Sequence, residues 1–388
     1  MNRLITAACA VAVLATSSAC SLTESNDTSA SGGSGTINVD SSADACELTS
    51  TEAPSGNVVF KVKNTGSEVT EFYLYAEDGL RIVGEIENVG PGLSRDLVVR
   101  AAPGEYVTAC KPGMTGKGIR SEFTVTDSGK DTEITGVDQA TIDRATSQYA
   151  AYVRDQSQQL VDETTQFADA YKAGRDDEAR ELFPHARGYW ERIETVAESF
   201  GDLDPQMDAR EADLEPGQKW TGWHRIEKDL WPPANGYQQL GKAERATYAD
   251  DLVANTAVLD ERVQELEYTV DQIGNGSKGL LDEVASGKVT GEEDIWSHTD
   301  LYDFQANVDG ARVAYEGLKP LLEVKDPGLS EQIESEFVAL QALLDQYRQG
   351  EDDFVFYDTV TEPQRKELSD AVNALAEPLS KMTGAITL

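Results

Sequence analysis

The apolar positions after about residue 138 follow the period of an α-helix. Over 160–171 and over 252–273 they recur at alternating spacings of three and four, with charged residues between them. Proline and glycine interrupt the pattern at short intervals, as they do at connections between helices. Residues 138–388 therefore predict an all-α helical bundle, or two such bundles packed together.

The region before it has a different pattern. Between 37 and 127, short runs rich in Val, Tyr, Phe and Thr are separated by turn residues, and the runs lie at 58–64, 71–76, 95–101, 105–110 and 122–126. Several strands at such close spacing favour a small β-sandwich. The predicted fold class is a multidomain β + α protein, in which a β-sandwich over 37–127 precedes the helical-bundle domain.

The N-terminal residues predict export. Arg3 precedes an apolar run over 4–14 that is too short to span a bilayer, and small residues follow up to Cys20. We predict a signal peptide over 1–19 and, because 17–20 resembles a bacterial lipobox, lipidation of Cys20. Ser17 stands where a lipobox usually has Leu, which leaves ordinary secretion as the alternative.

Residues 20–36 are mostly Ser, Thr, Gly, Asn and Asp, and they predict a flexible tether between the anchor and the fold. The expected location is the cell envelope, either in a periplasm or on the outer face of the cell membrane. Contact with the membrane is expected only through the lipid.

The charge of the chain narrows the classes of partner. The sequence has 70 acidic and 33 basic residues, a formal net charge of −37. Such a surface repels nucleic acid and anionic membranes and attracts cations. A well-solvated surface, as in a salt-adapted organism, explains the same charge equally well.

The most specific candidate chemistry lies in the segment WTGWHRIEKDLW at 220–231. His224, one of three histidines in the chain, is followed three residues later by Glu227. On a helix this spacing puts both side chains on one face. An imidazole and a carboxylate that converge in this way suit iron or zinc better than calcium or magnesium. Chance occurrence of Glu at this offset is the alternative.

More acidic residues and a histidine flank this segment. Glu191 and Glu194 are also three apart, and the other candidates are Asp202, Asp204, Asp208, Glu211, His298, Asp300 and Asp303. A bundle core lined by Glu and His at this spacing is a known way to hold iron. The alternative is that these acids cap helices or lie on solvated faces.

The chain lacks the usual catalytic motifs. It has no HExxH, no GxSxG, and no glycine loop of the Walker or dinucleotide type. We therefore predict a protein that is not an enzyme. A metal-dependent peptidase and an acidic-polysaccharide-binding protein are the two alternatives.

Several segments of the helical region occur in an order that resembles the imelysin-like family, and most closely its EfeO-type members. These segments are ERIE, VAESFGDLDP, WTGWHRIEKDLW and WSHTDLYDFQANVDGA. The resemblance implies an exported component of a bacterial iron-uptake system, which captures ferrous or ferric iron for a membrane permease and works with an exported haem peroxidase. Copper and zinc are the expected competing metals.

The resemblance also assigns residues. The family signature GxHxxE is present as Gly222, His224 and Glu227. It implies that these last two bind the metal together with Glu191, Glu194 and Asp208.

The β region, with VKNTGSEVTEFYLY and PGEYVTACKPGM, resembles a cupredoxin domain. A blue-copper site needs two histidines, and this region has none: Glu71 stands where the first is expected, and Met114 lies near the second. An electron-transfer copper centre is therefore not expected. The resemblance implies Cys46, Glu71 and Cys110 as ligands of a second metal, whereas an oxidising compartment favours a disulfide between Cys46 and Cys110. The sequence leaves both alternatives open.

Overall fold

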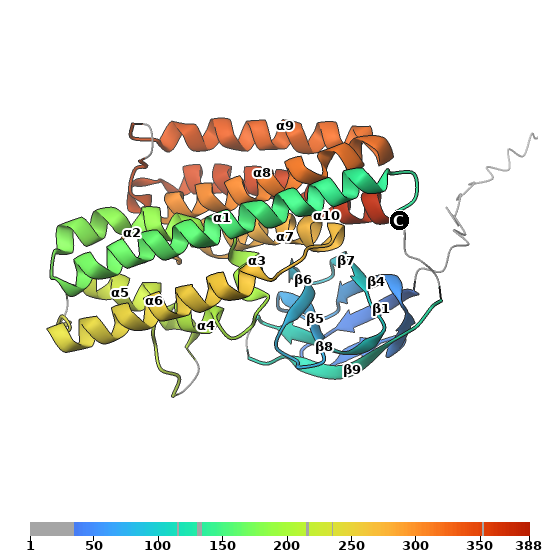
Figure 1. Ribbon diagram of the computed structural model, residues 1–388, viewed down its shortest axis with the longest axis horizontal. Helices are drawn as coiled ribbons and strands as arrows, with labels where there is room; N and C mark the ends of the chain where they lie inside the picture. The colour runs from blue at the N-terminus through green and yellow to red at the C-terminus, as the bar shows by residue number, and fades with distance from the viewer. Residues whose placement is uncertain (1–34, 115, 130–133, 215–216, 235, 351–352) are drawn as a thin grey trace, which may run out of the picture. The chain divides into compact units, whose positions relative to one another are not determined.

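A computed structural model describes residues 35–114, 116–129, 134–214, 217–234, 236–350 and 353–388. The predicted signal peptide, Cys20 and most of the predicted tether lie outside the described residues. The chain forms a β domain and then a helical domain, which confirms the predicted fold class (Figure 1).

Nine strands build the β domain in the described residues: β1 (Gly35–Ser41), β2 (Cys46–Leu48), β3 (Glu52–Pro54), β4 (Gly56–Asn64), β5 (Thr70–Ala76), β6 (Ile82–Val89), β7 (Ser94–Ala101), β8 (Gly104–Pro112) and β9 (Ile119–Thr126). They form one sheet of order β2-β1-β4-β7 and another of order β3-β9-β8-β5-β6. Strand β1 begins at Gly35, so residues 35 and 36 belong to a sheet and not to the predicted tether.

The core of the β domain lies between the two sheets. The ring of Phe60 in β4 lies 5.0 Å from that of Phe72 in β5 and 5.2 Å from that of Phe123 in β9. Side chains alternate between the two faces of each strand, so the neighbours of Phe72 in the sequence, Glu71 and Tyr73, point away from this core.

The α-helices of the second domain are α1 (Gln139–Lys172), α2 (Asp176–Glu191), α3 (Glu194–Glu198), α4 (Asp204–Met207), α5 (Trp223–Leu230), α6 (Lys242–Gln264), α7 (Val270–Glu283), α8 (Asp300–Lys325), α9 (Pro327–Leu344) and α10 (Glu362–Thr387). A π-helical turn, η2 (Val284–Lys288), continues α7. Helix α1 packs along both α2 and α6, and α8 packs against α7 and α9. One continuous apolar core runs from Ile134 to Ile386, so the helices form one bundle rather than two.

Two glycines allow backbones to approach closely inside this bundle. A Cβ atom at Gly310 of α8 would overlap the carbonyl oxygen of Arg192, so glycine lets α8 pack against the end of α2. Gly222, which precedes α5, has a φ of 86° and contacts the backbone of Met207 at the end of α4. The residue after Met207 is Asp208, so this contact brings Asp208 to the start of α5.

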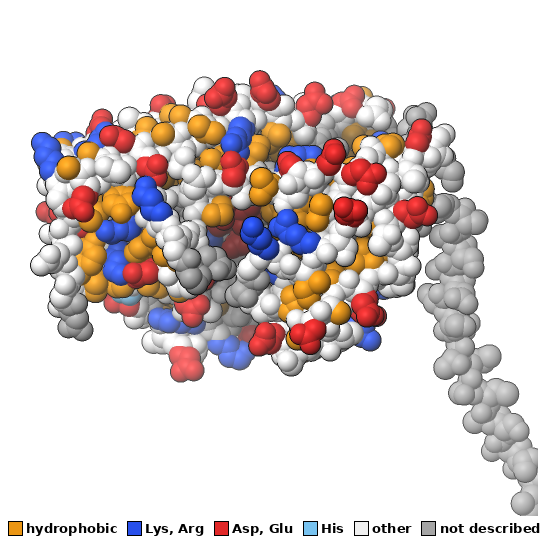
Figure 2. Space-filling model, turned by 90° about the horizontal axis from the view of Figure 1, so that it is seen from below, with side chains coloured by type: hydrophobic (Ala, Val, Ile, Leu, Met, Phe, Trp, Pro, Cys, Tyr) orange, Lys and Arg blue, Asp and Glu red, His pale blue; other side chains and the backbone are white. Residues whose placement is uncertain are grey.

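The surface is acidic without one dominant patch on the face that is drawn. Figure 2 shows Asp and Glu side chains scattered over this face, with Lys and Arg side chains among them. Among the described residues, none of the helices has both the length and the apolar character that a membrane span needs.

Candidate metal centre

Helix α5 carries His224 and Glu227 on one buried face, as their spacing predicts. The His224 side chain is 2% exposed and that of Glu227 is 0% exposed. The two contact each other directly, because His224 Nδ1 lies 3.0 Å from Glu227 Oε2.

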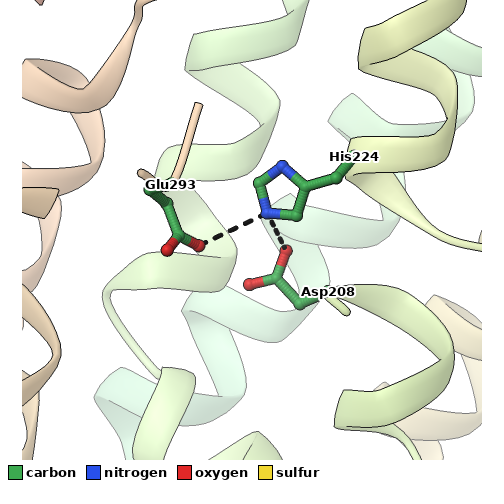
Figure 3. Close-up of side chains that lie close together, drawn as sticks. All are labelled: Asp208, His224 and Glu293. Atoms are coloured by element: carbon green, nitrogen blue, oxygen red, sulfur yellow. Dashed lines mark hydrogen bonds and ion pairs between the residues drawn. The ribbon is translucent and has the colours of Figure 1, made fainter. Parts of the chain in front are cut away.

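The other ring nitrogen of His224 faces two carboxylates from distant parts of the chain. His224 Nε2 lies 3.3 Å from Asp208 Oδ1 and 3.3 Å from Glu293 Oε1 (Figure 3). Potential ligand atoms of these three residues all lie within 4.8 Å of one another. Asp208 directly follows α4, and Glu293 lies in the segment between η2 and α8.

Glu227 is held firmly by the segment before α8. Its Oε1 accepts hydrogen bonds from the backbone N–H of Trp296 (2.9 Å), the backbone N–H of Ser297 (2.7 Å) and the hydroxyl of Ser297 (2.9 Å). Asp294 Oδ1 lies 3.7 Å from His224 Nδ1 on the same side of the ring.

Glu191 and Glu194 lie next to this centre, together with an ammonium group. Lys288 Nζ lies 3.2 Å from Glu191 Oε2 and 3.1 Å from Glu194 Oε1. The amide of Asn307 donates to Glu191 Oε2 and to Glu194 Oε2, each at 3.0 Å. With Asp208, the two glutamates form another group whose ligand atoms lie within 4.8 Å. The structure thus brings these predicted residues together, with Lys288 against them.

Arg187 in α2 is a second buried cation at the centre. It pairs with Glu191 and Asp208, donates to Glu293 Oε1 at 3.0 Å and donates to Asp303 Oδ2 at 3.1 Å. Arg187, Lys288 and Glu293 were absent from the sequence candidates. No signal in the sequence distinguished them, because single charged residues in a chain of this composition carry no periodic pattern.

The remaining sequence candidates have other surroundings. Asp202 pairs with Arg262 at 2.9 Å, and Glu211 pairs with Lys228 at 2.6 Å. Asp300 accepts from the backbone N–H of Asp294 at 3.2 Å. His298 belongs to none of the metal-compatible groups found among the described residues.

Carboxyl groups outnumber the cations that contact them here. Eight of them are buried: Glu191, Glu194, Asp208, Glu227, Glu293, Asp294, Asp300 and Asp303. Among the described residues, the Arg and Lys side chains in contact with the set are Arg187, Lys288 and, nearer the surface, Arg210, which lies 3.5 Å from Glu293 Oε2. Buried oxygens of Asp294, Asp300 and Asp303 lack a hydrogen-bond partner among the described residues. A buried carboxylate without a partner is costly, so this centre has a deficit of positive charge.

The pKa values show how the metal-free centre meets part of that deficit. Burial and Arg187 act to lower the pKa of His224, but hydrogen bonds to Asp208, Glu227 and Glu293 outweigh them and the pKa lies well above its ordinary value. Burial raises the pKa of Asp294 to about 7, and the neighbouring Glu227 adds to the effect. Burial and Glu191 likewise raise the pKa of Glu194. Protons on His224, Asp294 and Glu194 therefore supply part of the positive charge that the centre lacks.

Two family models match the chain. The imelysin model matches residues 145–382, and a cupredoxin-like model matches residues 6–125. An "Efem/EfeO family lipoprotein" of Staphylococcus haemolyticus is 46% identical over 250 residues, which are 64% of this chain and 85% of that protein. "Iron uptake system component EfeO" of Escherichia coli K12 is 34% identical over 351 residues, 88% of this chain and 89% of that protein. The chain belongs to the Efem/EfeO family.

Membership confirms the predicted resemblance and its two domains. The relatives quoted are named as an iron-uptake component and a lipoprotein rather than as enzymes, although the imelysin model is classed by name with peptidases. The prediction that the chain is not an enzyme agrees with these names.

In the β domain of this Efem/EfeO protein, Cys46 of β2 and Cys110 of β8 form a disulfide that joins the two sheets. Cys110 lies in the core, where its register partner is Phe72, whereas Glu71 is paired with Lys111 on the opposite face. The carboxylate of Glu71 accepts a hydrogen bond of 2.9 Å from Tyr73 Oη. Cys46, Glu71 and Cys110 therefore do not come together as a ligand set, because strand alternation separates Glu71 from the sulfur atoms. Met114 is 38% exposed in the connection to β9.

Proposed function

We propose that this protein is the exported metal-binding component of a bacterial iron-uptake system, which captures ferrous or ferric iron and passes it to a membrane permease. One observation carries the proposal: the buried imidazole of His224 has two carboxylates at its Nε2 atom, inside a cluster in which carboxyl groups outnumber the cations. An imidazole with carboxylates is a donor set that suits iron and, in competition, zinc or copper.

The names of the relatives support the same cargo, because the Escherichia coli proteins are called iron uptake system components. We propose the permease, and an exported haem peroxidase, as partners on the resemblance alone. Lipidation of Cys20 would keep the carrier near the membrane where a permease lies.

Metal titration tests the proposal. Apoprotein is titrated anaerobically with Fe²⁺, and in parallel with Zn²⁺ and Cu²⁺, in the unsubstituted protein and in a double variant, His224→Ala with Glu293→Gln. We expect the unsubstituted protein to bind one ion tightly. In the double variant the affinity for that ion should fall by at least about 100-fold, because two donors are removed at once. His185→Ala is the matched control, because His185 is 46% exposed and outside the cluster. Equal iron affinity in the double variant and the control would refute the site.

The peptidase alternative has no observation in its favour among the described residues. A metallopeptidase needs an ion with an open position beside a substrate cleft, whereas His224 and its neighbours are buried. Incubation of the iron-loaded or zinc-loaded protein with unfolded casein is expected to leave the casein intact.

A further inference from the structure

The two ring nitrogens of His224 face different sets of carboxyl groups, and the difference bears on which residues hold the metal. Spacing alone suggests that His224 and Glu227 share one ion. In the structure Glu227 lies at Nδ1, whereas Asp208 and Glu293 lie at Nε2. Figure 3 shows that one nitrogen of the ring points at both of the latter. An ion bound in the ring plane at Nε2 would therefore lie on the side of the ring away from Glu227.

We infer that the ion binds at His224 Nε2 with Asp208 and Glu293, and that Glu227 is a positioning residue that holds the imidazole from its other side. This inference rests on the proposed function, since it names the ligands of that same site. Glu293 then becomes a ligand, and Glu227 becomes the group that orients one.

The hydrogen bonds of Glu227 support this division. Its Oε1 already accepts three donors from the 296–297 segment, and its Oε2 accepts from Nδ1. An ion at Oε1 would have to displace one of these buried donors, and an ion shared by Oε2 and Nδ1 would have to replace the contact between them. A metal-bound histidine usually donates its second ring N–H to a carboxylate, which fixes both the ring and its tautomer. With a proton on Nδ1 held by Glu227, the lone pair of the neutral ring lies on Nε2.

The opposite side of the ring offers the competing arrangement. His224 Nδ1, Glu227 and Asp294 also have ligand atoms within 4.8 Å, and Asp294 Oδ1 lacks a hydrogen-bond partner among the described residues. Exposure decides against it: the side chains of Glu227 and Asp294 are both 0% exposed.

Asp208 and Glu293 lie on the side that solvent reaches. Their side chains are 5% and 7% exposed. The half-exposed Arg210 lies against Glu293 at 3.5 Å. An ion that enters from solvent therefore meets the Nε2 side first.

The test compares Glu227→Gln with Glu293→Gln, using Co²⁺ as a probe whose visible absorption bands report the ligands directly bound to it. In Glu227→Gln the amide oxygen can stay with its three donors, so the amide N–H₂ group faces Nδ1 and favours the tautomer with the proton on Nε2. We expect Co²⁺ affinity to fall about 10–100-fold. At saturating Co²⁺, the band positions should match those of the unsubstituted protein. In Glu293→Gln both the affinity and the band positions should change.

The inference is overturned if saturated Glu227→Gln has shifted bands while Glu293→Gln keeps the original ones. Should Glu227→Gln fail to fold, Ser297→Ala removes one donor from Glu227 and leaves every proposed ligand in place. It is expected to lower affinity a few-fold with unchanged bands, and shifted bands would count against the inference. Failure of the proposed function looks different: neither the unsubstituted protein nor any variant would then take up Co²⁺ or Fe²⁺ tightly.

Discussion

Gly222 gives the sharpest test of how the fold builds the centre, through the substitution Gly222→Ala. This residue has a φ of 86° and a ψ of −163°. Only glycine adopts this region freely, and a side chain there costs about 1–3 kcal/mol. The added Cβ would also lie 2.8 Å from Met207 Cα and would overlap the carbonyl oxygen of Met207. Ordinary carbon contacts are about 3.5–4.0 Å.

The overlap is with backbone, so relief requires the end of α4 to move away from α5. That movement carries Asp208 away from His224 Nε2, which now lies 3.3 Å from its carboxylate. We expect a loss of unfolding free energy of about 3 kcal/mol or more, since strain and displacement add. Metal affinity should fall together with stability.

Gly317→Ala is the matched control, because Gly317 lies within α8 and nothing within 4 Å would meet its Cβ. It should be neutral or stabilising by about 0.5–1 kcal/mol, as alanine is the better helix former. Urea denaturation monitored by circular dichroism, followed by Fe²⁺ titration of the folded protein, measures both effects. The reasoning is refuted if Gly222→Ala keeps its stability within about 0.5 kcal/mol of the unsubstituted protein and its iron affinity is unchanged.

Three more predictions concern stability and use urea denaturation as the assay. Lys288→Met leaves Glu191 and Glu194 without their buried ammonium group and should lower the free energy of unfolding by about 3–5 kcal/mol. Its control is Lys366→Met, at a side chain that is 73% exposed, which should leave the free energy of unfolding almost unchanged. Similar losses in the two variants would contradict the role of Lys288. Replacement of both Cys46 and Cys110 by Ser opens a loop of 64 residues and should lower the free energy of unfolding by about 2–5 kcal/mol. A loss of under about 1 kcal/mol would be evidence against a disulfide that links the two sheets. Burial and nearby carboxylates raise the pKa of Glu87 to about 8, above the value of 4.5 expected in the unfolded chain. The folded state therefore holds an extra proton between these two values, so this contribution to stability is complete below about pH 4.5 and is lost as the pH rises towards 8. Glu87→Gln should make that fall shallower, and an unchanged slope would argue against it.

The sequence predicted those parts of the site that lie within one helix. His224 and Glu227 share a face because three residues make almost one turn. The other contacts depend on how distant segments pack. Asp208 reaches His224 because glycine at 222 admits the backbone of Met207, and Glu293 lies in a segment without helical or strand periodicity.

The β domain shows the same limit at the level of strands. Strand β6 was not among the predicted runs. Glu85 and Glu87 occupy alternate positions along it, so the segment lacks the apolar character by which the other strands were predicted. The disulfide and a three-ligand site were equally compatible with the sequence. The register of β5 against β8 decides between these two alternatives, because it sets Glu71 opposite Lys111.

Under the proposed function, Arg187 and Lys288 bear on how the protein would release its iron. A protein that hands over its cargo has to stay folded with the site vacant, when the repulsion among its carboxylates is greatest. The positively charged side chains of Arg187 in α2 and Lys288 in η2 stay beside those carboxylates whether or not an ion is present. They would therefore narrow the difference in free energy between the protein with iron bound and the protein without it. Transfer of the ion to a partner would then cost less free energy than it would from a site that held carboxylates alone.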